Sequence, residues 1–599
     1  MRYIHALKFQ TLSLYALVLP LVFIIACGST APAAPEPTAA PAAEPTAAPL
    51  AGETPQPTSA PVAQATPTPP PPSSESPSGT LTAGLPELGR FSGHPAEAVL
   101  PSLPLMNSAG MAEGLMLLDI DREIQGHLLE SWSVSEDFTT WTMKFPRGVQ
   151  CHKGYGEMTS EDVRWSYQEG WALSTTHSRA SEFNEFWLNP NGSVDTSDPY
   201  TLVVNAGFPH SAANSIQQWM VPGGAGNWVS CNRQFDEMGF EEADQNTAFT
   251  GSYEILEHEI GQWRMGAVED HWRQTPHFEE LIFAEIPEES TRLAGFQTGN
   301  LDTFTMSIDS ISVVQSVPGA ELMVLDGGAD YSLQIYGMYH VEALAGEPRE
   351  SWDPDLPWVS ANPDVNSQEW QDAVKVRQAL SIAIDRETII DTILGGYARP
   401  SVMGRWSYNE DRLGRSWEYN PDRARQLLAE AGYADGFRVT LTPQIQCAPG
   451  IVEACEAIAT MWDNDLGIDV NFQNVPWSTV NPQRVARTYQ GIICATGTQR
   501  VIPGTQVDVT TEGGTSIGGT HPFLEEIMPR ISAAVDDRER ERLEEEVGAF
   551  MFDNAFTQLG LFVGQTVTPV GPRIEEWSEH INIRDLRFMN GYEYIRPRQ

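Results

Sequence analysis

The chain is 599 residues long, and its 36 basic and 80 acidic residues give it a formal net charge of −44 at pH 7. So acidic a composition excludes nucleic-acid binding as the main function, because phosphate groups are bound by basic surfaces. A chain of this length exceeds what one hydrophobic core supports, so two or more lobes are expected.

The first 26 residues have the pattern of a secretory signal peptide. Two basic residues, Arg2 and Lys8, precede a short apolar run, TLSLYALVLPLVFIIA. This run is shorter than the about 20 apolar residues that a membrane-spanning helix needs. The run ends in IIAC, which resembles the bacterial lipobox, a signal in which the cysteine is lipidated and becomes the first residue. We therefore expect lipidation at Cys27. The alternative is a plain signal anchor with an incidental cysteine.

Residues 27–78 are dominated by proline, alanine, threonine and serine. Such a composition cannot bury a core, so we expect a disordered linker between the lipid anchor and a folded body. That body, residues 79–599, opens with GTLTAGLPE, in which Leu81, Ala83 and Leu85 alternate as in a strand. Strand-like and helical runs alternate along the rest, which indicates the α/β class.

Two helical blocks can be read in detail. The first runs from about Val374 to Leu394, with Asp385 as an internal cap and a stop at Gly395. The second is NPDRARQLLAEAG, residues 420–432, which begins with a capping asparagine and a proline suited to the first turn. An alternating strand, residues 437–441, follows it.

The sequence contains six cysteines, of which five belong to the body. Disulfides are permitted outside the cytosol, and Cys447 and Cys455 are the pair closest in sequence. We therefore consider a bridge between these two, with at least one body thiol left over.

Five blocks of the body together resemble the family 5 extracytoplasmic solute-binding proteins, the dipeptide, oligopeptide and nickel receptors of ABC importers. They occur in the family's order and span most of the body: residues 126–167, 251–272, 280–304, 376–400 and 419–441. Glu113, Gly114 and Leu115 resemble its E-G-L segment, which mainly supports packing.

The resemblance implies a periplasmic-binding-protein-like clamshell of the large cluster C type, with two α/β lobes joined by a two-strand hinge. Lobe one would comprise residues 79–310 with a C-terminal return at 555–599, and lobe two residues 311–554. Such a protein captures a small solute by hinge closure and delivers it to a membrane permease. The implied partners are ABC permease and ATPase subunits and the membrane, through the lipid. A monomer without cofactor, metal or catalysis is expected, located outside the cytoplasm.

The chain departs from the peptide-binding members in one segment. Those members carry an aspartate that pairs with the α-ammonium of the ligand, in a W-x-x-D-like segment that corresponds here to residues 491–509. Thr498, Gln499 and Arg500 stand there instead, and an unpaired buried ammonium costs several kcal/mol. A dipeptide with a free amino terminus is therefore disfavoured, unless Asp508 takes the role in a shifted register.

Four further residues are predicted to contact the ligand. Arg405 could bind a carboxylate of the ligand, and Trp406 could provide a stacking wall or a cation–π face. The alternative is that Arg405 is a solvated loop residue and Trp406 fills a gap between the lobes. Glu87 and Asn107 lie at the ends of early segments of lobe one.

Three other functions remain open at this stage. The same clamshell could report solute to a membrane signalling protein, and some relatives capture nickel. Gly514-Thr515-Ser516-Ile517-Gly518 formally matches the G-x-S-x-G of serine hydrolases, with Asp536 and His580 in the right order. Residues 507–511, VDVTT, could be the strand that this motif needs, and a helix could start near Thr520, but the motif itself stands in a polar, glycine-rich loop.

Overall fold

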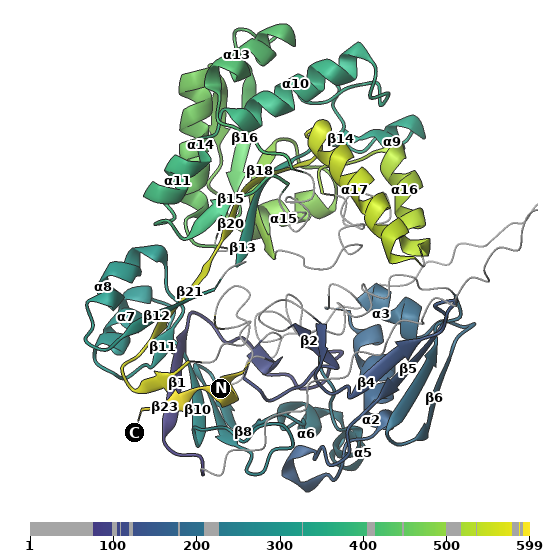
Figure 1. Cartoon of the computed structure of the whole chain (residues 1–599), viewed down its shortest axis with the longest axis vertical. Coiled ribbons are helices and arrows are strands. Elements are labelled where there is room, and N and C mark those ends of the chain that lie inside the picture. Colours follow the sequence, from purple (N-terminus) through teal and green to yellow (C-terminus); the bar gives the residue numbers. More distant parts are fainter. Residues whose placement is uncertain are drawn as a thin grey trace, which may run out of the picture. The chain divides into compact units, whose positions relative to one another are not determined.

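The structure is a computed structural model of the whole chain (Figure 1). It describes residues 76–98, 105–107, 109–118, 124–175, 177, 180–208, 227–325, 328–403, 414–445, 448–498, 517–534, 536–577, 586 and 591–598. All of them belong to one unit, Ala60–Gln599. The predicted signal peptide, Cys27 and nearly all of the linker lie outside the described residues. In the described part of the chain, no helix is both long and apolar enough to cross a membrane.

The predicted first strand is β1 (Thr80–Leu85), and Leu81, Ala83 and Leu85 are fully buried. It belongs to a five-stranded sheet of order β11-β1-β10-β9-β8. The other strands are β8 (Tyr253–Glu259), β9 (Gln262–Ala267), β10 (Glu280–Glu285) and β11 (Thr303–Phe304). Because β10 and β11 both run parallel to β1, the carboxyl ends of these three strands lie at one edge of the sheet.

A four-stranded antiparallel sheet of order β4-β5-β7-β6 shares its core with the first sheet. Its strands are β4 (Ser131–Val134), β5 (Thr140–Lys144), β6 (Ser193–Asp198) and β7 (Thr201–Asn205). The helices nearby in sequence are α2 (Ser160–Trp165), α3 (Ala180–Trp187), α5 (Asn232–Met238) and α6 (Phe240–Gln245). A disulfide joins Cys151 to Cys231, so two segments 80 residues apart are fixed together.

A six-stranded sheet of order β15-β20-β13-β18-β16-β17 has a core of its own. Its strands are β13 (Ala329–Ile335), β15 (Ala398–Pro400), β16 (Arg438–Pro443), β17 (Asp469–Phe472), β18 (Ile492–Thr498) and β20 (Gln558–Gly564). The helices of this part include α9 (His340–Leu344), α10 (Gln368–Ile382), α11 (Arg386–Thr392), α13 (Pro421–Glu430), α14 (Ile451–Leu466), α15 (Trp477–Val485), α16 (Pro522–Ala533) and α17 (Asp537–Asp553).

The two helical blocks predicted from the sequence are confirmed. Asn420 caps α13 by accepting the N–H of Arg423 at 2.9 Å. The block at 374–394 is divided into α10 and α11, and Asp385 between them accepts the N–H of Thr388 at 3.0 Å. An oxygen-bearing side chain thus satisfies an otherwise unpaired donor at both helix starts.

Two adjacent stretches of chain connect the six-stranded sheet to the rest of the protein. β12 (Glu321–Leu325) pairs antiparallel with β21 (Thr566–Val570), and β12 is followed by β13 while β21 is preceded by β20. Beyond this pair, Gly328 N–H donates to Gly564 C=O at 2.7 Å. Figure 1 shows β21 leading away from the six-stranded sheet. This is the predicted two-strand connection of an α/β clamshell fold.

The C-terminal segment returns to the first core. β22 (Ile574–Glu576) pairs with β23 (Arg596–Pro597), and Ile574, Tyr592 and Ile595 are buried in the same cluster as β1 and β10. The limits of the two lobes, and of the return at residues 555–599, stay a prediction.

The disulfide considered between Cys447 and Cys455 is wrong. Cys455 bonds to Cys494, with the two Cα atoms 6.1 Å apart. The reason is tertiary: Cys455 lies on the buried face of α14, and that face packs against β18, which carries Cys494. Nearness in sequence could not show this contact.

Candidate functional site

A cavity of about 600 Å³ lies at the carboxyl edge of the parallel strands β1, β10 and β11, beside the two connecting stretches. Its charged and polar lining includes Glu87, Glu289, Arg292, Thr305, Gln565 and Thr566. Its apolar and aromatic lining includes Phe304, Ile308, Ile311, Tyr331, Leu394 and Tyr397. Its size and its position at the carboxyl edge of parallel strands are typical of a small-molecule site.

Arg292 occupies the second turn of α7 (Glu289–Gln297) and is only 5% exposed. Its Nη1 donates to the carbonyls of Ile286 and Pro287 at 2.6 and 2.8 Å, and its Nε donates to Thr305 C=O at 2.9 Å. Burial lowers the pKa of Arg292, and the charge of Glu289 opposes this. The third nitrogen, Nη2, stands 4.0 Å from Glu289 Oε2, too far for a hydrogen bond.

Glu289 stands in the first turn of α7, where the helix dipole favours a carboxylate. Its Oε1 accepts three hydrogen bonds, from Ser307 N–H at 2.8 Å, Ser307 Oγ at 2.8 Å and Ser310 Oγ at 2.5 Å. These bonds hold the carboxylate in place and leave Oε2 facing Arg292.

Two threonine hydroxyls complete the polar wall. Thr305 Oγ1 and Thr566 Oγ1 are both buried, and neither has a hydrogen-bond partner among the described residues. A buried polar atom without a partner costs about 1–3 kcal/mol. Either hydroxyl would gain a hydrogen bond if its side chain turned toward a ligand in the cavity.

Tyr331 and Tyr397 supply the aromatic part of the wall. The hydroxyl of Tyr331 donates to Pro449 C=O at 2.7 Å, and its ring lies 5.9 Å from that of Phe562 in an edge-to-face contact. The backbone of Tyr397 accepts the N–H of Gln565 at 2.8 Å. The rings are thus held by the six-stranded sheet and its connection to the rest of the chain.

Of the residues predicted from the sequence, Glu87 lines this cavity and is exposed. Thr498 ends β18, and its backbone pairs with Ala329, which also lines the cavity. Gln499, Arg500, Arg405, Trp406 and Asp508 lie outside the described residues, so their contact with ligand stays a prediction.

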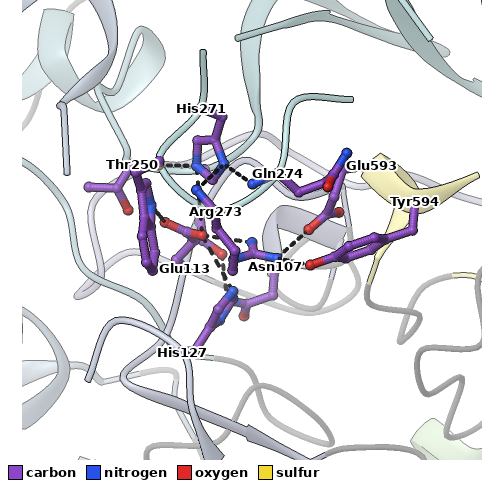
Figure 2. A network of polar contacts seen from close by, with 12 residues as sticks. Asn107, Glu113, His127, Thr250, His271, Arg273, Gln274, Glu593 and Tyr594 are labelled. Atoms are coloured by element: carbon purple, nitrogen blue, oxygen red, sulfur yellow. Dashed lines mark hydrogen bonds and ion pairs between the residues drawn. The ribbon is translucent and has the colours of Figure 1, made fainter. Parts of the chain in front are cut away.

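Asn107 lies elsewhere, at the edge of a buried polar network shown in Figure 2. Its Nδ2 donates to the carbonyls of Ala112 and Asn227, both at 2.9 Å, and the residue is 7% exposed. The side chain therefore holds two backbone segments together, and it is not among the residues that line the cavity.

The centre of that network is the fully buried Glu113, within the predicted E-G-L segment. Arg273 Nη2 donates to Glu113 Oε1 at 2.8 Å, and Arg273 Nη1 donates to Glu593 Oε1 at 2.6 Å. His127 Nε2 lies 3.4 Å from the Glu113 carboxylate. Burial alone would raise the pKa of Glu113, but His127 and the Arg273 charge outweigh burial and lower it well below its ordinary value. This network ties the C-terminal return to the first core.

The enzyme and metal alternatives gain no support from the described residues. Asp536 caps α17 by accepting the N–H of Glu539 at 3.0 Å, while Ser516 and His580 lie outside the described part. One group there brings three metal-type ligands together: Cys151, Asp162 and Cys231. Its two cysteines form a disulfide, and both oxygens of Asp162 accept backbone N–H groups.

Sequence reasoning missed Arg292, Glu289, Thr305 and Thr566. A signal for the first two existed, because polar residues that follow a parallel strand gather at its carboxyl edge, and PEESTR follows β10 directly. Thr566 comes from a strand more than 250 residues later, and only the tertiary fold brings it to the same cavity.

Comparison with known proteins identifies the family. Residues 123–511 match the family model "Bacterial extracellular solute-binding proteins, family 5 Middle", which is more than half of the chain. The chain is 24% identical over 383 residues to heme-binding protein A of Haemophilus influenzae, covering 59% of this chain and 63% of that protein. It is 24% identical over 349 residues to the glutathione-binding protein GsiB of Escherichia coli K12, covering 55% and 57%. The matched region is thus less than two thirds of either relative's length.

Two solved structures show the same fold. The substrate binding protein CtaP of Listeria monocytogenes superposes with a TM-score of 0.70 at 15% identity, covering 87% of this chain and all of that one. DppA of Helicobacter pylori, in complex with the peptide STSA, gives 0.62 at 17% identity, covering 86% and 98%. The chain belongs to the bacterial extracellular solute-binding proteins of family 5.

Proposed function

We propose that this protein is the extracytoplasmic solute receptor of an ABC importer. It binds a peptide-like or other small organic solute and presents it to a membrane permease, without catalysing a reaction. The observation that carries the proposal is the position of the cavity, which lies where the sheets of a family 5 chain are connected by only two stretches of backbone.

The mechanism follows from that position. A solute in the cavity touches residues of the five-stranded sheet, of β13 and of the connecting β21 at once. If some of these contacts exist only when the lobes are closed, solute shifts the population toward the closed form. We propose lobes of residues 79–310 with 555–599, and of 311–554. The permease would then recognise the closed form.

The chemical range of the solute is kept broad. Relatives and structural neighbours are named for heme, glutathione, peptide and Ni(L-His). The wall of this cavity combines apolar and aromatic residues with polar ones, which suits an organic solute better than a bare ion.

We also propose that Cys27 carries a lipid that anchors the receptor to the membrane. The support is the IIAC sequence after a short apolar run and the proline-rich linker that follows. Mass spectrometry of the N-terminal peptide tests this: a diacylglycerol-modified Cys27 is expected, and an unmodified cysteine preceded by an intact leader would contradict it.

The function is tested by native mass spectrometry of the full-length protein, purified without added solute, before and after unfolding and refolding. The proposal predicts a bound organic molecule of defined mass that is lost on unfolding. If no molecule is released, and no peptide, sugar, amine or metal chelate at 100 times a plausible Kd adds the expected about 2.7 kcal/mol of stability, solute capture is contradicted.

A further inference from the structure

The charged groups that line the cavity form an unusual set. They are Glu87, Glu289 and Arg292. Glu87 is exposed, whereas Arg292 is buried and stands 4.0 Å from Glu289. The Arg292–Glu289 pair is neutral as a whole, yet its two facing atoms, Nη2 and Oε2, are not hydrogen-bonded to each other.

We propose that this cavity binds an uncharged primary amide group of the solute between Arg292 and Glu289. The amide oxygen accepts from Arg292 Nη2, the amide N–H donates to Glu289 Oε2, and the hydroxyls of Thr305 and Thr566 bind neighbouring polar atoms of the solute. This inference rests on the proposed receptor function and adds to it the chemical class of the group that is recognised.

The pairing of groups favours an amide. One face of the site offers a donor and the adjacent face an acceptor, and a primary amide carries its acceptor oxygen and one N–H donor on the same edge. In a trans secondary amide these two groups point in opposite directions. The positions of both protein groups are fixed, because Nε and Nη1 of Arg292 bind three carbonyls and Oε1 of Glu289 binds two serines.

The charges disfavour an ion. A carboxylate in this place would set three carboxylates against one guanidinium, and an ammonium would approach the buried Arg292. Taking an ion out of water is repaid only by close, well-made contacts with opposite charge, and Arg292 and Glu289 already neutralise each other. A neutral amide adds hydrogen bonds and leaves the balance unchanged.

Three matched probes test the proposal on the full-length protein after removal of any bound solute: N-acetylphenylalaninamide, N-acetylphenylalanine and phenylalaninamide. They share one aromatic body, and at pH 6, where the titrations are done, they are neutral, anionic and cationic in that order. Isothermal titration calorimetry should show the neutral probe binding at least about tenfold more tightly than either charged probe, which corresponds to about 1.4 kcal/mol.

Two isosteric variants locate the contact. Thr305→Val removes a hydroxyl that lines the cavity and should weaken the neutral probe about fivefold, or about 1 kcal/mol. Thr303→Val is the control, because Thr303 Oγ1 is also buried without a partner among the described residues but does not line the cavity. It should leave the affinity unchanged.

The proposal is overturned if a charged probe binds as tightly as the neutral one, if no probe binds, or if both variants behave alike. These outcomes are distinguishable from failure of the receptor function. A solute released from the purified protein, or any other solute that stabilises it, would uphold solute capture even when the amide assignment fails.

Discussion

The hydrogen bonds of a partly buried arginine, Arg273, and a buried one, Arg292, are satisfied in different ways. Each Nη of Arg273 donates to a carboxylate, Glu113 at 2.8 Å and Glu593 at 2.6 Å. In Figure 2, the side chain of Arg273 lies between those of Glu113 and Glu593. Arg292 instead binds backbone carbonyls with two of its nitrogens and holds Glu289 only at 4.0 Å.

The difference separates a structural site from a binding site. The Arg273 network joins residues 160 and 320 positions apart in the sequence and has its charges paired within the protein. The Arg292–Glu289 pair lines a cavity, next to hydroxyls that lack a partner among the described residues. Full pairing stabilises the fold, whereas incomplete pairing at a cavity leaves hydrogen-bonding capacity for a ligand.

The largest expected effect on stability comes from removing Arg273 from its network with Glu113 and Glu593. Arg273→Met leaves Glu113 and Glu593 buried without their cation and should cost about 3–5 kcal/mol of unfolding free energy. Urea denaturation measures it. Arg438→Met is a suitable control, because the Arg438–Asp469 pair is exposed at 3.6 Å and should matter little. Equal losses in both variants would contradict the structural role of the network.

Acid should weaken the same region. His152, whose Nε2 lies 2.8 Å from Gly251 C=O, is buried, and burial lowers its pKa from 6.5 to about 4. The unfolded chain therefore takes up this proton first, and stability is lost as pH falls from 6.5 to about 4, by roughly 3 kcal/mol at full titration. The low pKa of Glu113 acts in the same direction at lower pH, since its charged form stabilises the folded state.

Denaturation curves between pH 7 and pH 4 check this, with His152→Gln as the variant. The wild-type protein should lose more stability over this interval than the variant does. Parallel pH profiles would show that His152 is not the group responsible.

A smaller effect is expected at the cavity. Glu289→Gln removes the negative neighbour of Arg292 and keeps an oxygen for the serine hydrogen bonds. The variant should bind N-acetylphenylalanine about tenfold more tightly than the wild type, because its carboxylate then faces an unopposed guanidinium. Calorimetry measures the shift, and unchanged selectivity would show that Glu289 does not face the ligand.

The smallest effect concerns stability without ligand. Thr305→Val and Thr303→Val each remove a buried hydroxyl that has no partner among the described residues. Neither substitution should lower the unfolding free energy, because no protein hydrogen bond is lost and a buried hydroxyl without a partner is removed. Urea denaturation of the solute-free protein would detect a loss, which would reveal a partner for the hydroxyl concerned.

Local structure was predictable where the sequence carries its own signals. Asn420 and Asp385 cap helices as expected, and the alternation of Leu81, Ala83 and Leu85 marks a buried strand. These features depend on residues a few positions apart. The family resemblance added the two connected α/β parts, which the sheets and the family match confirm.

Features that depend on tertiary contact were not predictable. Cys455 bonds to Cys494 because α14 lies against β18, although Cys447 is closer in sequence. The cavity wall combines residues of α7, β11 and β21. No local sequence pattern indicates that Thr566 and Arg292 line the same cavity. Glu87 could be predicted because it follows the end of β1, and residues that follow parallel strands gather at the carboxyl edge of the sheet.

The most direct test of solute capture at this cavity is hydrogen–deuterium exchange of the full-length protein with its co-purified solute and after refolding without it. The account predicts that solute slows exchange in peptides that cover residues 303–311 and 564–568, and leaves those around Glu113 and Glu593 unchanged. Protection confined to other parts of the chain, or none at all, would contradict it.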